Sequence, residues 1–82
     1  MFDDFMTQEL KLTKKNSSII EGIKANVQNM IFINDIKIPI EEGDIFEYNL
    51  PSGIHQKLLV TKVTLYNIGS SLDHYEIEYI KD

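Results

Sequence analysis

The chain has 82 residues, enough for one small domain with a single core, and a formal net charge of −5. It contains no cysteine, which excludes a disulfide framework and a thiolate metal site, so hydrophobic burial and hydrogen bonding must hold the fold together. Every positive side chain is a lysine, and the absence of arginine together with the acidic balance disfavours nucleic-acid binding.

The N-terminal residues MFDDFM carry acidic side chains where a secretory signal would be positively charged. No apolar run reaches the length of a membrane span, so we expect a cytoplasmic protein without membrane association, or a virion-associated one if it is a phage structural protein. Residues 1–7 are expected to form a short helix or a mobile segment, with Phe2, Phe5 and Met6 on one face. Residues 8–82 are expected to form a single small β domain.

The first strands are predicted from Gln8 onward. Isoleucine dominates the apolar residues and alanine occurs once, at Ala25, a composition that favours strands over helices. Leu10 and Leu12 alternate with polar residues, and the cluster KKNSS (14–18) then predicts a turn. The segment that follows is predicted to place these residues on one face: Ile19, Ile23, Ala25 and Val27. Together the two segments predict a first hairpin.

Residues 30–40 predict a second, tight hairpin with Asn34–Asp35 as its two-residue loop. The facing pairs would be Ile33 with Ile36 and Ile31 with Ile38. Phe32 would point to the opposite face. Pro39 has no N–H to donate to a ladder, which indicates an edge or the end of a strand.

The stretch EEGDIFEYNLPSG (41–53) predicts a turn, a strand and a second turn. Gly43 supplies a residue that tolerates positive φ, and Asp44 can accept backbone N–H groups. The apolar face of the strand would hold Phe46, Tyr48 and Leu50. Pro51 and Gly53 occupy the second and fourth positions of a type I turn, where each is favoured.

Two longer strands complete the chain. Residues 56–66 have apolar side chains on both faces, which indicates a central strand or a bulge near Thr61 and Lys62. In the last strand, HYEIEYI (74–80), the inner face would hold Tyr75, Ile77 and Tyr79, and the outer face His74, Glu76 and Glu78. The sum is about six strands in hairpin order, which predicts a mainly β fold: a small antiparallel barrel or a strongly curled sheet.

The chemistry-bearing residues are few. The serines fall in predicted turns, and His55 follows a turn as an exposed polar residue. His74 shares a strand face with Glu76 and Glu78, which is how a metal or proton-transfer site can begin, but alternating charge is also the ordinary solvated face of an antiparallel sheet. We therefore expect no enzyme, no catalytic or metal-binding residue, no cofactor and no small-molecule substrate.

A protein-interaction or assembly module, acting on a protein partner or by self-association, fits this composition best. The candidate interaction residues are Phe2, Phe5, Met6, Phe32, His74 and Glu76. The competing interpretation is that the phenylalanines only complete the core or a dimer contact. The alternative function is a small barrel that binds single-stranded nucleic acid on its aromatic residues.

The phrases IEEGDIFEYNLPSG, LLVTKVTLY and HYEIEYIK resemble small uncharacterised bacterial proteins of prophages and mobile elements, in which Gly-Asp, Leu-Pro-x-Gly and His-Tyr occur at similar spacing. The resemblance covers the chain from about residue 10 onward and implies no activity. It implies a phage-derived assembly, connector or host-interaction factor, with these marked positions: Asp44, Leu50, Pro51, Gly53, His74 and Tyr75. The strands of those proteins are often rich in arginine, whereas this chain has Glu47, Tyr48 and Lys57 there. The resemblance therefore does not imply a charged surface like theirs on this chain.

Overall fold

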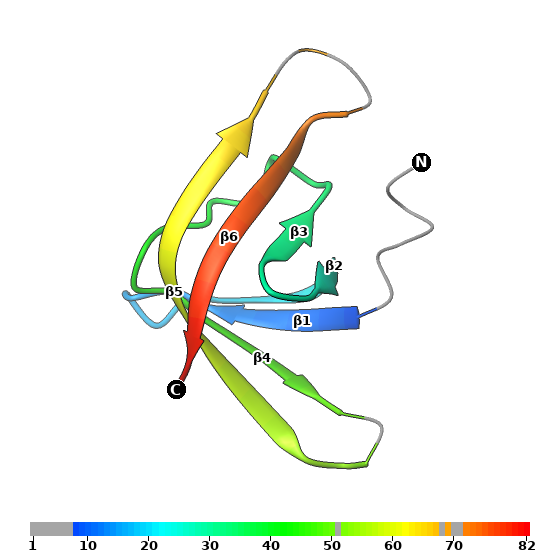
Figure 1. Ribbon diagram of the computed structural model, residues 1–82. Helices are drawn as coiled ribbons and strands as arrows, with labels where there is room; N and C mark the ends of the chain where they lie inside the picture. The colour runs from blue at the N-terminus through cyan, green and yellow to red at the C-terminus, as the bar shows by residue number, and fades with distance from the viewer. Residues whose placement is uncertain (1–7, 51, 68, 70–71) are drawn as a thin grey trace.

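A computed structural model of the chain describes residues 8–50, 52–67, 69 and 72–82, which form a closed barrel of antiparallel strands (Figure 1). The strands are β1 (Gln8–Thr13), β2 (Ile19–Val27), β3 (Ile31–Ile33), β4 (Ile45–Asn49), β5 (His55–Tyr66) and β6 (His74–Lys81). This confirms the prediction of a small antiparallel barrel. The predicted helix or mobile segment at residues 1–7 lies outside the described residues.

The strands follow the order β1-β2-β3-β6-β5-β4 around the barrel, and β4 closes it by pairing with β1. Each of the two halves, β1-β2-β3 and β4-β5-β6, is a run of hairpins. The connection between the halves, residues 34–44, carries the chain from β3 to β4 without pairing these strands. As a consequence, β3 has β6 as its second neighbour.

The predicted hairpin with an Asn34–Asp35 loop is wrong. Neither residue has the positive φ that a tight hairpin loop of this kind requires, and β3 ends at Ile33. Ile36 and Ile38 instead pack against the core from the 34–44 connection. The connection is held there by the Tyr75 hydroxyl, which donates to the carbonyl of Ile38 at 2.7 Å.

The core consists of the inward-facing side chains of all six strands, and Phe46 is the largest that is fully buried. The other buried apolar residues are Leu10, Leu12, Ile23, Ala25, Ile31, Ile33, Ile40, Leu58, Val60, Tyr75 and Ile77. Tyr48 and Tyr79 pack against this core, as their strand alternation predicts. Phe32 lies on the outer face of β3, between the buried Ile31 and Ile33, as the sequence pattern predicts.

A bulge in β2 overturns one predicted orientation. Leu10 pairs with Ile23 and Leu12 with Ile20, so two residues of β2 lie opposite Lys11. One of these two is Gly22, whose φ of 74° suits a bulge. The extra residue switches the inward side, so Ile20 packs on the core while Ile19, predicted to face inward, is 57% exposed.

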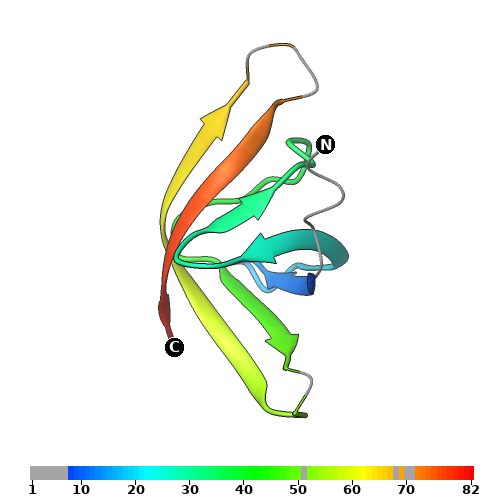
Figure 2. The ribbon, with the colours of Figure 1, turned by 45° about the vertical axis from the view of Figure 1, so that its right-hand side comes forward.

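The bulge predicted near Thr61 and Lys62 is confirmed, since the register of β5 and β6 shifts between Val60 and Lys62. The β4–β5 and β5–β6 hairpins both extend beyond the barrel, in opposite directions (Figures 1 and 2). In the first of these hairpins Gly53 donates to the carbonyl of Leu50 at 2.8 Å, which agrees with the predicted turn. Pro51 lies outside the described residues.

A buried ion pair ties the 34–44 connection to the β1–β2 turn. Asp44 is fully buried and accepts the backbone N–H of Glu41 at 2.8 Å and that of Lys15 at 3.3 Å, which confirms its predicted role. Lys14 Nζ lies 2.5 Å from the Asp44 carboxylate and 3.1 Å from that of Glu41, and it also donates to the carbonyl of Pro39. Burial lowers the pKa of Lys14, but its hydrogen bonds to Asp44 and Glu41 outweigh this effect and raise the pKa above 10.5.

Candidate functional site

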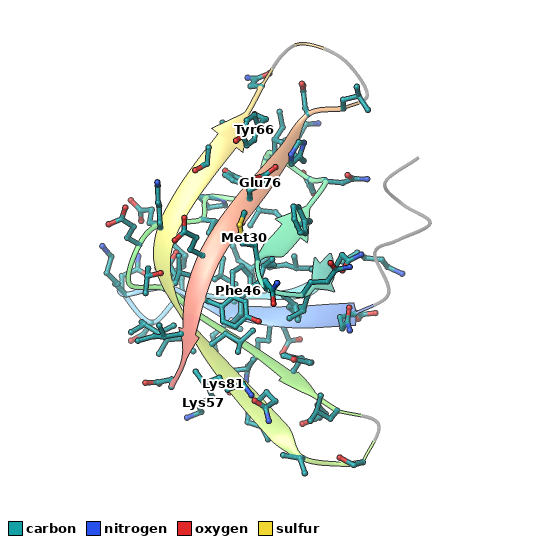
Figure 3. The ribbon with its side chains drawn as sticks, in the orientation of Figure 1. Met30, Phe46, Lys57, Tyr66, Glu76 and Lys81 are labelled. Atoms are coloured by element: carbon teal, nitrogen blue, oxygen red, sulfur yellow. The ribbon has the colours of Figure 1, made fainter. Side chains whose placement is uncertain are left out.

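Three of the predicted interaction residues meet on the outer face of β3 and β6. Phe32 and Glu76 are cross-strand partners, and His74 lies 3.1 Å from Glu76 through Nε2 and Oε2. Figure 3 shows Glu76 on β6 and Tyr66 near the end of β5. The other predicted interaction residues, Phe2, Phe5 and Met6, lie outside the described residues.

His74 has an oxygen acceptor at each ring nitrogen. Nδ1 lies 2.7 Å from the carbonyl oxygen of Leu72, and Nε2 faces the Glu76 carboxylate. Because neither oxygen can donate a proton, only the imidazolium form satisfies both contacts. Burial lowers the pKa of His74, but the Leu72 carbonyl, Glu76 and Asp73 outweigh it and raise the pKa above 6.5.

The His74 ring also stacks on Tyr66, with ring centroids 4.9 Å apart and an interplanar angle of 16°. Since Tyr66 ends β5 and His74 begins β6, the stack joins the two strands where the hairpin leaves the barrel. Glu78, the third residue of the predicted polar face, does not join this group, because it lies 4.0 Å from Lys62. Within the part of the chain that the structure describes, no three His, Cys, Asp or Glu side chains converge as a metal site.

Exposed apolar side chains gather on the same hairpin. Six large apolar residues are exposed among the described residues, and three of them lie at the loop end of this hairpin: Leu65 (45%), Tyr66 (42%) and Leu72 (53%). Leu65 lies opposite Tyr75, and Tyr66 lies opposite His74, so Leu65 and Tyr66 point to opposite faces of the hairpin. The apolar residues therefore surround this end of the hairpin.

Sequence analysis did not single out Leu65, because residues 56–66 have apolar side chains on both faces. Leu65 does lie on the face of Val63, opposite the buried Tyr75, but β4 pairs with β5 only as far as Leu59, so Leu65 has no neighbour from β4 to cover it. The signal was the length of the strand: β5 has 12 residues and its other neighbour, β4, has 5. Because β5 is so much longer than β4, its C-terminal part must extend beyond the strand that would cover it.

The hairpin is acidic as well as apolar. Residues 63–77, at its loop end, contain Asp73 and Glu76 and no lysine, whereas Glu78 faces Lys62. The surface of this end therefore combines exposed aliphatic and aromatic carbon with carboxylates, and its one basic group is the His74 imidazole.

The second histidine stands on the other protruding hairpin. His55 lies 2.8 Å from Glu47 Oε1 through Nε2 and 2.9 Å from Asn49 Oδ1 through Nδ1. The hydrogen bond from His55, supported by Lys11 and opposed by burial, lowers the pKa of Glu47. Glu47 is thus held at the barrel surface by Lys11 and His55, so the predicted exposed role of His55 is supplemented by a structural one.

Comparison of the chain with protein-family models, curated proteins and solved structures finds no match. None of the described residues forms a helix that is long and apolar enough to span a membrane.

The His74 contacts predict that the hairpin is more stable at acidic pH. Since the folded-state pKa is raised, the stabilisation is fully present below the unfolded-state pKa of about 6.5 and is lost as the pH rises through the folded-state pKa. We expect His74→Asn to remove about 1 kcal/mol at low pH and less above the folded-state pKa. Thermal melting across this range measures the effect, with Glu76→Gln as a second variant. An NMR titration that placed the His74 pKa at or below 6.5 would contradict it.

Proposed function

We propose that this protein is a non-enzymatic interaction module that binds another protein through the β5–β6 hairpin. The observation that carries the proposal is the concentration of exposed apolar side chains on this protruding element: Leu65, Tyr66 and Leu72. Exposed apolar patches on a small soluble domain commonly mark binding surfaces, and tyrosine is enriched among residues that dominate interface energies.

The chemistry of the hairpin specifies the partner. An apolar tip needs an apolar pocket, and the carboxylates of Asp73 and Glu76 favour lysine or arginine at the rim of that pocket. An anionic lipid surface or a phosphate backbone would be repelled by the same carboxylates. We therefore propose a protein partner with a basic-rimmed apolar pocket.

The resemblance to prophage proteins supplies the biological setting of the proposal: an assembly, connector or host-interaction factor. The alternative, binding of single-stranded nucleic acid, is favoured by the exposed ring of Tyr66, on which a base could stack. It is disfavoured by the acidic hairpin around that ring and by the net charge of −5.

Affinity capture from the native host tests the proposal. The bait proteins are the intact chain, a triple variant (Leu65→Ser, Tyr66→Ser, Leu72→Ser) and the control Ile54→Ser, which alters a residue 56% exposed on the opposite hairpin. We expect a protein that the intact chain and the control retain and the triple variant loses. With that protein purified, the triple variant should bind at least about tenfold more weakly, as expected for loss of interface hot spots.

Three further measurements complete this experiment. Equal melting temperatures of the bait proteins exclude a folding defect. A chain lacking residues 1–6 tests the contribution of Phe2, Phe5 and Met6, and loss of the partner there would move the site to the N-terminus. Salt-dependent retention of single-stranded DNA at low ionic strength, with no protein partner, would support the alternative function instead.

A further inference from the structure

A second surface, which crosses β5 and β6 away from the loop that joins them, has a pattern that only the strand pairing reveals. Five residues from five neighbouring strands are successive cross-strand partners and form a continuous row, here named the apolar strip: Ile19, Thr13, Ile45, Leu59 and Ile80. The strip faces outward, because Leu12, Phe46 and Leu58, which are the chain neighbours of three of these residues, are buried in the core. Its ends are open, with Ile19 57% and Ile80 55% exposed.

A row of alternating charge runs beside the strip, two residues further along each strand. We name it the charge ladder, and in strand order it consists of Glu21 on β2, Lys11 on β1, Glu47 on β4, Lys57 on β5 and Asp82 after β6. Lys11 pairs with Glu47 and Glu47 with Lys57 in the strand register, and Asp82 donates its N–H to the carbonyl of Lys57 at 3.0 Å. Figure 3 shows Lys57 on β5, beside the C-terminal part of β6.

We propose that the apolar strip is the interface of a homodimer whose two-fold axis runs parallel to the strands, between β4 and β5. Under this axis Ile45 meets Leu59 of the partner subunit, and Leu59 meets the partner's Ile45. Ile80 at the open end comes to lie over the partner's Thr13. An interface of this kind is isologous, since the same four residues of both subunits cover one another; Ile19, at the other end of the strip, lies beyond them.

The charge ladder favours a second copy of this chain as the occupant and a two-fold axis that runs between two strands. Of these axes, the one between β4 and β5 is favoured by the apolar strip, since it places Ile45 and Leu59 rather than Thr13 nearest the axis. With the axis between β4 and β5, Glu47 faces the partner's Lys57 and Lys11 faces the partner's Asp82, so all four contacts across the interface join opposite charges. An axis through β4 would place Lys11 against the partner's Lys57 and Glu47 against its own copy, both of which repel. A ladder that alternates in sign is therefore complementary to itself, and a second copy of this chain fits it.

The apolar strip and the charge ladder together have the composition of a protein interface, with aliphatic side chains in the centre and charged residues at the rim. The hairpin residues Leu65, Tyr66 and Leu72 are not part of it. The dimer is thus independent of the proposed function, and either proposal can fail while the other stands.

Sedimentation equilibrium of the full chain tests the dimer. We expect a reversible dimer at concentrations below about 1 mM, and Leu59→Lys should weaken it by more than about tenfold while the chain stays folded. The matched control is Ile54→Lys, which places the same charge on an exposed isoleucine outside the strip, and the hairpin triple variant is a second control. Both controls should dimerise like the unmodified chain.

A mixing experiment separates the interface from effects on the fold. Lys57→Glu alone places Glu47 against a glutamate of the partner, and Glu47→Lys alone places Lys57 against a lysine, so each variant should dimerise at least tenfold more weakly. Mixing the two restores both attractive contacts, and the mixture should form a dimer with one chain of each kind. A chain that is monomeric up to about 1 mM, a dimer that Leu59→Lys leaves intact or Ile54→Lys disrupts equally, or a mixture no better than its components would overturn the proposal.

Discussion

Replacement of Lys14 by methionine is expected to lower the free energy of unfolding by about 3–5 kcal/mol, because it leaves the Asp44 carboxylate buried without its counter-charge. Asp44 has no exposed surface, and Lys14 Nζ is its cationic partner at 2.5 Å. A domain of this size has roughly 4–12 kcal/mol of stability in total, so the loss is a large share of it. Thermal or urea unfolding measures it.

The matched control is Lys62→Met, since Lys62 is exposed and lies 4.0 Å from Glu78. An exposed pair at this distance contributes within about 1 kcal/mol, so the control should melt close to the unmodified chain. If the two variants lose equal stability, the Lys14–Asp44 pair does not lock the 34–44 connection.

The same pair predicts a pH dependence in alkaline solution. Because the folded-state pKa of Lys14 is raised, its stabilisation is complete below its unfolded-state pKa of about 10.5 and is lost as the pH rises through the folded-state value. The unmodified chain should therefore lose stability above this pH, and Lys14→Met should show a smaller loss. An equal decline in both proteins would assign it to other groups.

The second large effect is expected from Phe46→Ala, which should cost about 3–5 kcal/mol because it leaves a cavity at the centre of the barrel. Phe46 is fully buried, pairs with Leu12 of β1 on one side and Leu58 of β5 on the other, and both partners are buried too. No neighbouring strand can move inward to fill the space without breaking its own pairing, so little of the cost is recovered.

Phe32→Ala removes the same group of atoms from the outer face of β3 and serves as the control. Phe32 is only half-buried, so we expect a loss of about 1 kcal/mol. Equal losses at the two positions would mean that strand alternation does not describe the barrel interior. Both variants are compared by chemical denaturation.

The features that the sequence predicts correctly are those set by interactions between residues that are close together along the chain. The alternation of apolar and polar residues predicts the inner faces of β1, β4 and β6 correctly, because one face of each strand packs on the core. Examples are Leu10, Phe46 and Ile77, which are all buried. The turn at residues 14–18 is equally local, and Lys14 and Ser18 pair there as the polar cluster predicts. The bulge near Thr61 is also visible in the sequence, because the apolar residues of the strand change from one face to the other there.

The failures come from interactions between distant segments. The Asn34–Asp35 hairpin satisfied the local pattern, but β3 pairs with β2 and β6 instead, and the 34–44 connection is fixed by Tyr75 and by Lys14. Ile19 was assigned to the wrong face because the pattern does not reveal the bulge beside Gly22. Of the predicted site, Phe32, His74 and Glu76 do share a face, but the role of Tyr66 depends on its stacking with a residue eight positions away.

By itself, therefore, the sequence determined the strand content, the inward residues of most strands and the acidic, arginine-free character of the chain. Only the tertiary structure decided which strands are neighbours. The charge ladder, the apolar strip and the protrusion of the β5–β6 hairpin all follow from that order of strands. The physical reason is that side-chain alternation is a property of one strand, whereas pairing register brings together residues whose separation along the chain leaves no local pattern.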